Sequence, residues 1–80
     1  MFLEIIKPDS ELFKGEVSSV RVPGSQESGS FELLQDHMAI VSTLKSGTVH
    51  VINANNEALS FEVAGGVIEM SKNKITLLAD

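Results

Sequence analysis

Apolar and polar residues alternate along most of the chain, a pattern typical of β-strands with one buried face. In the segment ALSFEVA, Leu59, Phe61 and Val63 alternate with Ser60 and Glu62. Similar segments predict further strands at residues 2–6, 16–22, 48–52, 66–70 and 74–79. Such short strands, with no long amphipathic segment between them, predict an all-β fold. We expect an antiparallel β-sandwich or flattened barrel of about ten short strands in two sheets.

Turn-forming residues separate the predicted strands. Residues 53–57 (NANNE), the pair Gly65-Gly66 and the pair Lys72-Asn73 lie where hairpin turns are needed. Residues 23–30 (PGSQESGS) are small and polar, which predicts an exposed loop. Within residues 16–22 the apolar phase shifts between Val17 and Val20, so a continuous strand there requires a β-bulge.

Residues 9–15 carry the one helical alternative. Asp9 or Ser10 can begin a helical turn, and Gly15 can end it. We favour a bent strand, because Glu16 and Val17 continue directly into the next extended segment.

The chain length predicts one small domain over residues 1–80. A core of this size buries roughly 60 to 65% of the unfolded surface and leaves a net stability of only about 3 to 5 kcal/mol. There is no cysteine, which excludes a disulfide framework, a thiolate metal site and a cysteine nucleophile. We therefore expect a protein partner to supply part of the stability.

Charge and hydropathy narrow the class of partner. The net charge is −5, and the six Lys and Arg residues are scattered, so a nucleic-acid surface is not expected. The amino terminus has no basic leader, and no apolar run approaches the roughly 20 residues of a membrane span. We expect a soluble, cytoplasmic chain without direct membrane insertion, which meets a membrane only through a partner.

The polar side chains give little support for a metal site, an acid–base pair or a phosphate-binding site. His37 and His50 are not at the spacing of two metal ligands on one helical face, so we predict no metal site. Glu62 and Glu69 occupy the solvent-exposed positions of their strands, where carboxylates are hydrated and are not expected to act as a general acid or base. Gly65-Gly66 has no phosphate-binding motif around it, and it more simply allows a sharp bend or close packing.

The triplet Gln35-Asp36-His37 has two interpretations. An Asp can orient a His that activates a nearby serine, Ser42 or Ser46. Neighbouring side chains of an extended segment point to opposite faces, however, and no oxyanion pocket is identifiable. We favour a polar turn between two buried strands, and we predict no catalytic and no cofactor-binding residues.

Three segments, residues 2–25, 33–49 and 61–80, carry a family pattern. The first matches at Leu12, Phe13, Gly15, Val17, Gly24 and Ser25; the second at His37, Ile40, Val41, Leu44, Lys45 and Gly47; the third at Gly65, Gly66, Ile68, Glu69, Thr76, Leu78, Ala79 and Asp80. Together and in this order they resemble the N-terminal β-sandwich domain of the epsilon subunit of bacterial F-type ATP synthase.

The departures from the family pattern concern proline. Gln35 stands where the family usually has Pro, Met38-Ala39 replaces Ala-Pro, and Ser46 replaces the Pro before Gly47. These losses indicate a less rigid connection around His37 than in typical members.

The resemblance implies a central-stalk, or rotor, subunit that links the gamma subunit to the membrane c-ring and couples ion transport to ATP synthesis. The chain stops at Asp80, where the family's inhibitory C-terminal helices would follow, so we expect a truncated epsilon subunit that performs no bond chemistry and needs no cofactor. It would lie on the cytoplasmic side of the plasma membrane as a peripheral part of the complex. The alternative from another class is a free-standing β-sandwich module that binds a ligand or peptide; a small hydrolase built on Asp36 and His37 comes third.

The resemblance also assigns two contact zones. The corner that carries His37 and Ser42 is expected to face gamma, and the loop at residues 24–32 is expected to face the c-ring. That loop comprises Gly24, Ser25, Gln26, Glu27, Ser28, Gly29, Ser30, Phe31 and Glu32. Glu27 and Glu32 are the candidates to meet basic groups of the ring.

Overall fold

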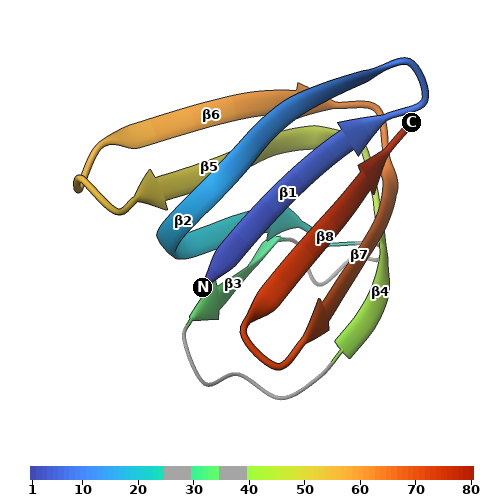
Figure 1. The fold of residues 1–80 in the computed structure, drawn as a ribbon. Coiled ribbons are helices and arrows are strands. Elements are labelled where there is room, and N and C mark those ends of the chain that lie inside the picture. The colour runs from blue at the N-terminus through green and yellow to red at the C-terminus, as the bar shows by residue number, and fades with distance from the viewer. Residues whose placement is uncertain (25–29, 35–39) are drawn as a thin grey trace.

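The computed structural model describes residues 1–24, 30–34 and 40–80, and the side chains of residues 1–24 and 41–80. All the regular structure in these residues is β-strand, which confirms the all-β prediction (Figure 1). The strands are β1 (Phe2–Lys7), β2 (Ser10–Pro23), β3 (Ser30–Leu34), β4 (Ile40–Leu44), β5 (Gly47–Asn53), β6 (Ala58–Val63), β7 (Gly66–Ser71) and β8 (Lys74–Ala79).

The strands form a curled, mixed sheet in the order β4-β7-β8-β1-β2-β5-β6, with β3 paired to β2. The 14-residue strand β2 joins two halves: its first part pairs with β1, and its second part pairs with β3 and β5. Figure 1 shows β2 bending from one half to the other. The arrangement is consistent with a β-sandwich. The predicted count of about ten strands in two sheets is not confirmed, since the described residues form eight named strands in one curled sheet. The prediction of purely antiparallel pairing is corrected, because β1 and β8 run parallel.

The core lies between the two halves and follows the alternation of each strand. In β1, Leu3 and Ile5 are fully buried, and in β8 Ile75 and Leu77 are. The other half contributes Val20, Val22, Val49 and Val51. Phe13 of β2 and Phe61 of β6 pack against this cluster, with ring centroids 5.7 Å apart. Close packing of this kind makes the sheet stiff, because interiors at crystal-like density have low compressibility.

A β-bulge lies within β2, as the apolar phase shift predicts. Val17 pairs with Asn53 and Ser19 pairs with Ile52, so Ser18 is the extra residue. Its hydroxyl donates to the carbonyl oxygen of Ile52 at 3.3 Å. The helical alternative for residues 9–15 is wrong, since β2 begins at Ser10 and the bent strand that we favour is present.

Two of the three predicted hairpin turns are confirmed. Residues 54–57 connect β5 to β6, and Lys72-Asn73, with Lys72 at a φ of 57°, connects β7 to β8. The pair Gly65-Gly66 is not a hairpin turn. It links β6 to β7, which pair with different strands, so the chain crosses there from one half of the fold to the other.

Asn53 organises the β5–β6 turn. Its Oδ1 accepts hydrogen bonds from the backbone N–H groups of Asn55 and Glu57, each at 2.9 Å, and its Nδ2 donates to Glu57 Oε1 at 3.0 Å. We predict that Asn53→Ala lowers the free energy of unfolding by about 1 kcal/mol, because the turn then loses these side-chain hydrogen bonds. Urea denaturation measures the change. Asn55→Ala, in the same turn, is the matched control, and an equal loss in that variant would contradict the assignment.

Candidate functional site

The residues expected to face partners lie at the end of the sheet that carries β3 and β4. Gly24 is buried, and its backbone forms a β-bridge with Leu44 of β4. Ser30, Phe31 and Glu32 belong to β3, where they pair with Pro23, Val22 and Arg21 of β2. The rest of the expected c-ring loop, residues 25–29, lies outside the described residues. The base of this loop is therefore held by a strand ladder on one side and by β4 on the other.

The expected gamma-facing corner is described only on its β4 side. His37, with Asp36, lies outside the described residues. Ser42 is half-buried, and its hydroxyl donates to the carbonyl oxygen of Thr43 at 3.2 Å. Its strand neighbour Val41 has the opposite orientation and is 72% exposed. Val41 and Thr43 are thus the exposed residues of this strand among its described side chains, and the apolar one, Val41, was not selected by the sequence reasoning.

An apolar stripe crosses the outer face of β7, β8 and β1, formed by Val67, Leu78 and Ile6. Val67 pairs with Leu78 in the antiparallel ladder, and Leu78 pairs with Ile6 in the parallel one. Val67 is 38% exposed, Leu78 is 51% exposed and Ile6 is half-buried. The three residues line a shallow cleft of about 420 Å³ together with Pro8 and Asp80.

The stripe has a signal in the sequence that alternation alone does not reveal. Each of its residues belongs to an apolar doublet within a strand: Ile5-Ile6, Val67-Ile68 and Leu77-Leu78. Successive side chains of a strand point to opposite faces, so one member of every doublet must leave the core. Whether the outward-facing residues of the three doublets contact one another depends on the register of the strands, and here the register places them side by side.

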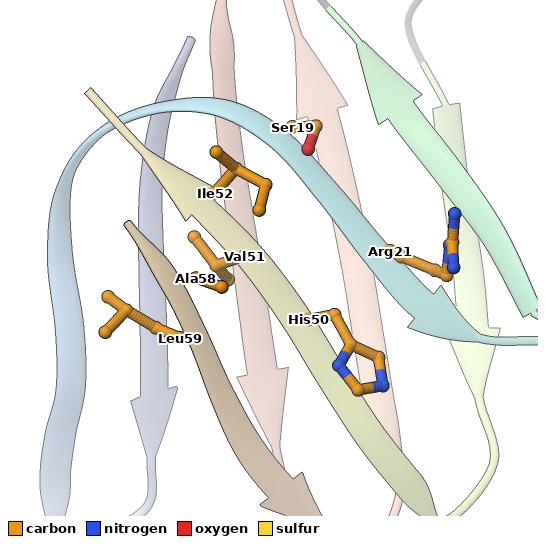
Figure 2. Close-up of a pocket in the computed structure, with 7 residues that line it drawn as sticks. All are labelled: Ser19, Arg21, His50, Val51, Ile52, Ala58 and Leu59. Atoms are coloured by element: carbon orange, nitrogen blue, oxygen red, sulfur yellow. The ribbon is translucent and has the colours of Figure 1, made fainter. Parts of the chain in front are cut away.

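A second surface, a shallow groove over β2, β5 and β6, lies on the outer face of the other half (Figure 2). Ser19 and Arg21 reach it from β2, and His50 and Ile52 reach it from β5, with Arg21 and His50 directly paired in the ladder. Ala58 and Leu59 of β6 complete a hollow of about 260 Å³. An adjoining hollow shares Arg21 and His50 and extends to Lys45, Ser46 and Thr48.

The polar groups of the described residues do not form a catalytic arrangement. Glu62 and Glu69 are exposed, as predicted, and Glu62 Oε2 accepts a hydrogen bond from Thr48 Oγ1 at 2.5 Å. Glu4 lies 3.8 Å from the ammonium of Lys74. Among the described side chains, no polar or charged residue is fully buried, and no three His, Asp or Glu gather closely enough to hold a metal ion.

Within residues 1–24, 30–34 and 40–80, the fold contains no helix whose length and apolarity suffice to cross a bilayer.

Comparison with known proteins identifies the family. Residues 1–80 match the family described as ATP synthase, Delta/Epsilon chain, beta-sandwich domain. The chain belongs to this family. The resemblance stated from its three sequence segments is therefore confirmed.

Curated relatives agree with this assignment. The chain is 38% identical over 81 residues to the ATP synthase epsilon chain of Campylobacter hominis, covering 100% of this chain and 61% of that relative. It is 37% identical to the epsilon chain of Chlorobaculum tepidum, and the match covers 98% of this chain and 86% of that relative. It is 36% identical to the epsilon chain of Protochlamydia amoebophila, and the match covers 98% of this chain and 52% of that relative. The chain thus spans between about half and most of the length of these relatives.

Solved structures share the fold. The Euglena gracilis mitochondrial ATP synthase, solved as OSCP, F1 and c-ring, superposes with a TM-score of 0.86 at 18% identity, over 96% of this chain and 48% of that chain. The structure of the central stalk and c-ring of the Tetrahymena thermophila mitochondrial ATP synthase superposes with a TM-score of 0.77 at 16% identity. The superposition covers 98% of this chain and 61% of that chain. At these identities the likeness concerns the fold alone.

Proposed function

We propose that this epsilon-type domain, residues 1–80, is a rotor part of an F-type ATP synthase that links the gamma subunit to the membrane c-ring. The observation that carries the proposal is the family match over the whole chain, together with relatives named ATP synthase epsilon chain at up to 38% identity. The domain is non-catalytic and uses no cofactor. It lies on the cytoplasmic side of the membrane as a peripheral component of the complex.

A mechanical link requires stiffness and two contact surfaces, one for each partner. The continuous ladder from β4 to β6 through the shared strand β2 supplies the stiffness. The two surfaces are the loop at residues 24–32 and the apolar stripe with the neighbouring strand β4. A torque applied at one surface then reaches the other through hydrogen-bonded strands and a packed core.

The c-ring side of the proposal rests on the loop at residues 24–32. Its base is fixed by the Gly24–Leu44 bridge and by the pairing of β3 with β2. Glu27 and Glu32 are the candidates to meet basic groups of the ring. Charges at the rim of an interface mainly set orientation and association rate, which suits a contact that must keep one register under load.

The gamma side of the proposal rests on the corner that carries His37 and Ser42, extended by Val41 and the apolar stripe. Within the stripe, Val67, Leu78 and Ile6 adjoin one another in the ladders, and adjoining exposed apolar residues mark protein interaction sites more often than scattered ones do. Docking of gamma on this surface stabilises the small domain by mass action. A free-standing ligand-binding module is not favoured by the named relatives, which are all ATP synthase epsilon chains.

Co-purification with the gamma subunit of the same organism tests the proposal. We expect a stoichiometric complex with the unaltered chain, and a loss of gamma binding of at least about tenfold in Leu78→Glu, because a buried, unpaired carboxylate opposes docking. Ser60→Glu, an exposed position on β6 in the other half, is the matched control. Thermal unfolding of both variants without gamma verifies that they are folded.

Three outcomes contradict parts of this proposal. Absence of any complex with gamma overturns the rotor role. Full gamma binding by Leu78→Glu removes the apolar stripe from the interface and leaves the β4 corner. Full binding by His37→Ala removes the reason for placing gamma at His37.

A further inference from the structure

Strand β6 is a terminal strand of the sheet, and one of its two edges is free of strand pairing. It pairs with β5 over its whole length, and no other strand of the described residues pairs with it. Figure 1 shows β5 beside β6. The free edge therefore presents backbone N–H and C=O groups with which a further strand can pair.

The turn before β6 shows which backbone groups lie on this free edge. The N–H of Asn53 donates to the carbonyl oxygen of Glu57 at 3.0 Å, so this pair bonds across the ladder. Bonded pairs of an antiparallel ladder recur at every second residue, and the register of β5 with β6 has no shift. The inward-facing residues of β6 therefore bond to β5. The backbone groups on the free edge belong to the three exposed residues, Ala58, Ser60 and Glu62.

The free edge of β6 has none of the features by which edge strands usually avoid further pairing. Proline, lysine, a β-bulge or an inward-pointing charge would each oppose it. β6 contains no Pro and no Lys, its ladder has no bulge, and its inward-facing residues are all apolar. Its one charged residue, Glu62, lies on the outer face and accepts a hydrogen bond from Thr48 of β5. The edge is thus open to another strand.

The sequence of β6 is complementary to itself in one antiparallel register. A two-fold axis at Ser60 places Ser60 opposite Ser60 of a second copy, and Ala58 opposite Glu62. Every residue with backbone groups on the free edge then meets another such residue, and each pair can exchange two hydrogen bonds. On the inner face, the half-buried Leu59 and Phe61 lie opposite Phe61 and Leu59 of the second copy, so more of their apolar surface leaves water.

The other two-fold registers are less favourable. An axis at Glu62 places two carboxylates directly opposite each other, which destabilises a strand pair. An axis at Ala58 moves most of the pairing out of β6 and into the β5–β6 turn. An axis between two residues pairs inward-facing with outward-facing positions, which places apolar residues on the wrong face. The Ser60 register uses the whole strand and keeps the like charges apart.

From these observations, we propose that β6 pairs with β6 of a second copy of this chain, antiparallel and with the two-fold axis at Ser60. The same surface is used on both copies, so pairing is complete at the dimer. The contact is one strand long, and each copy carries a net charge of −5, so the dimer is weak, with a Kd of about 0.1 to 1 mM. The apolar stripe lies outside this contact. The inference therefore goes beyond the proposed rotor role and does not rest on it.

Two lysine variants test the register, because each changes the net charge by the same amount. Ser60→Lys places two like charges directly opposite each other at the axis and should weaken dimerisation about five- to tenfold. Ala58→Lys places a lysine opposite Glu62 of the second copy, twice by symmetry, and should strengthen dimerisation about three- to tenfold. Sedimentation equilibrium of the full chain, from about 20 µM to about 2 mM and in about 0.15 M NaCl, measures the Kd.

Thr43→Lys is the matched control, because it adds the same charge at an exposed position of β4, the other terminal strand, and should leave the Kd unchanged. Thermal unfolding of each variant at low concentration verifies that it is folded. A chain that stays monomeric up to about 2 mM would overturn the proposal. Lysine variants at 58 and 60 that shift the Kd in the same direction would also overturn it, because the effect would then follow net charge and not register. Co-purification with gamma is a separate measurement, so either proposal can fail alone.

Discussion

Replacing Gly66 by alanine should lower the free energy of unfolding by about 3 kcal/mol or more. Gly66 begins β7 directly after the crossing from the other half, with a φ of 145°, a region that side-chain-bearing L residues rarely adopt. A Cβ built at this position would collide with the carbonyl oxygen of Leu78 and lie 3.0 Å from the Cα of Ala79. Both are backbone atoms of β8, so relief requires movement of the β7–β8 ladder.

The size of this effect matters because the domain is small. With a net stability of only about 3 to 5 kcal/mol, a loss of this size leaves a large fraction of the isolated chain unfolded. Gly15→Ala is the matched control. There a Cβ would meet only the ring of Phe13, at 3.6 Å, and a compatible substitution of this kind is neutral or stabilises by about 0.4 to 1 kcal/mol.

Chemical denaturation of the three proteins measures the difference. Equal stabilities of Gly66→Ala and Gly15→Ala would show that β7 and β8 are not held as closely as the structure places them. The same experiment separates two interpretations of the Gly65-Gly66 pair. A flexible hairpin tip would tolerate alanine, whereas a fixed crossing between the halves would not.

The sequence predicts the positions of the strands better than it predicts which strands pair with one another. Alternation in ALSFEVA or KITLLA is a property of each segment alone, because it only requires one wet and one buried face. The parallel pairing of β1 with β8 joins residues far apart in sequence, so the local pattern of FLEII does not predict it. For the same reason Gly65-Gly66 looks like a hairpin turn in sequence, although β6 and β7 lie in different halves.

The bulge and the surface features show the same difference between local signals, which can be read from one segment, and strand pairing, which cannot. The phase shift between Val17 and Val20 is local, so the bulge at Ser18 could be predicted. The approach of Arg21 to His50 depends on the ladder between β2 and β5, which joins residues far apart in sequence. The apolar stripe is intermediate, since each doublet requires an outward apolar residue, but only the register places Leu78 between Val67 and Ile6.

Leu77→Ala and Leu78→Ala should differ strongly although the two residues are adjacent. Leu77 is fully buried on the core side of β8, whereas Leu78 is 51% exposed on the outer face. Truncation of a buried leucine costs about 2 to 5 kcal/mol, from lost transfer free energy and the cavity left behind. The half-exposed residue leaves no enclosed cavity, so we expect Leu78→Ala to cost about 1 kcal/mol or less.

The comparison tests the strand register, because a shift of β8 by one residue would exchange the two faces. Urea denaturation of both variants gives the stabilities, and a greater loss in Leu78→Ala than in Leu77→Ala would contradict the register of β7, β8 and β1. We expect the effects on gamma binding to be reversed, with the larger loss of affinity in Leu78→Ala. Leu78→Ala keeps the fold but removes the centre of the apolar stripe, so its affinity for gamma should fall. Leu77→Ala, where it is still folded, keeps the stripe, and an excess of gamma should restore its apparent stability by mass action.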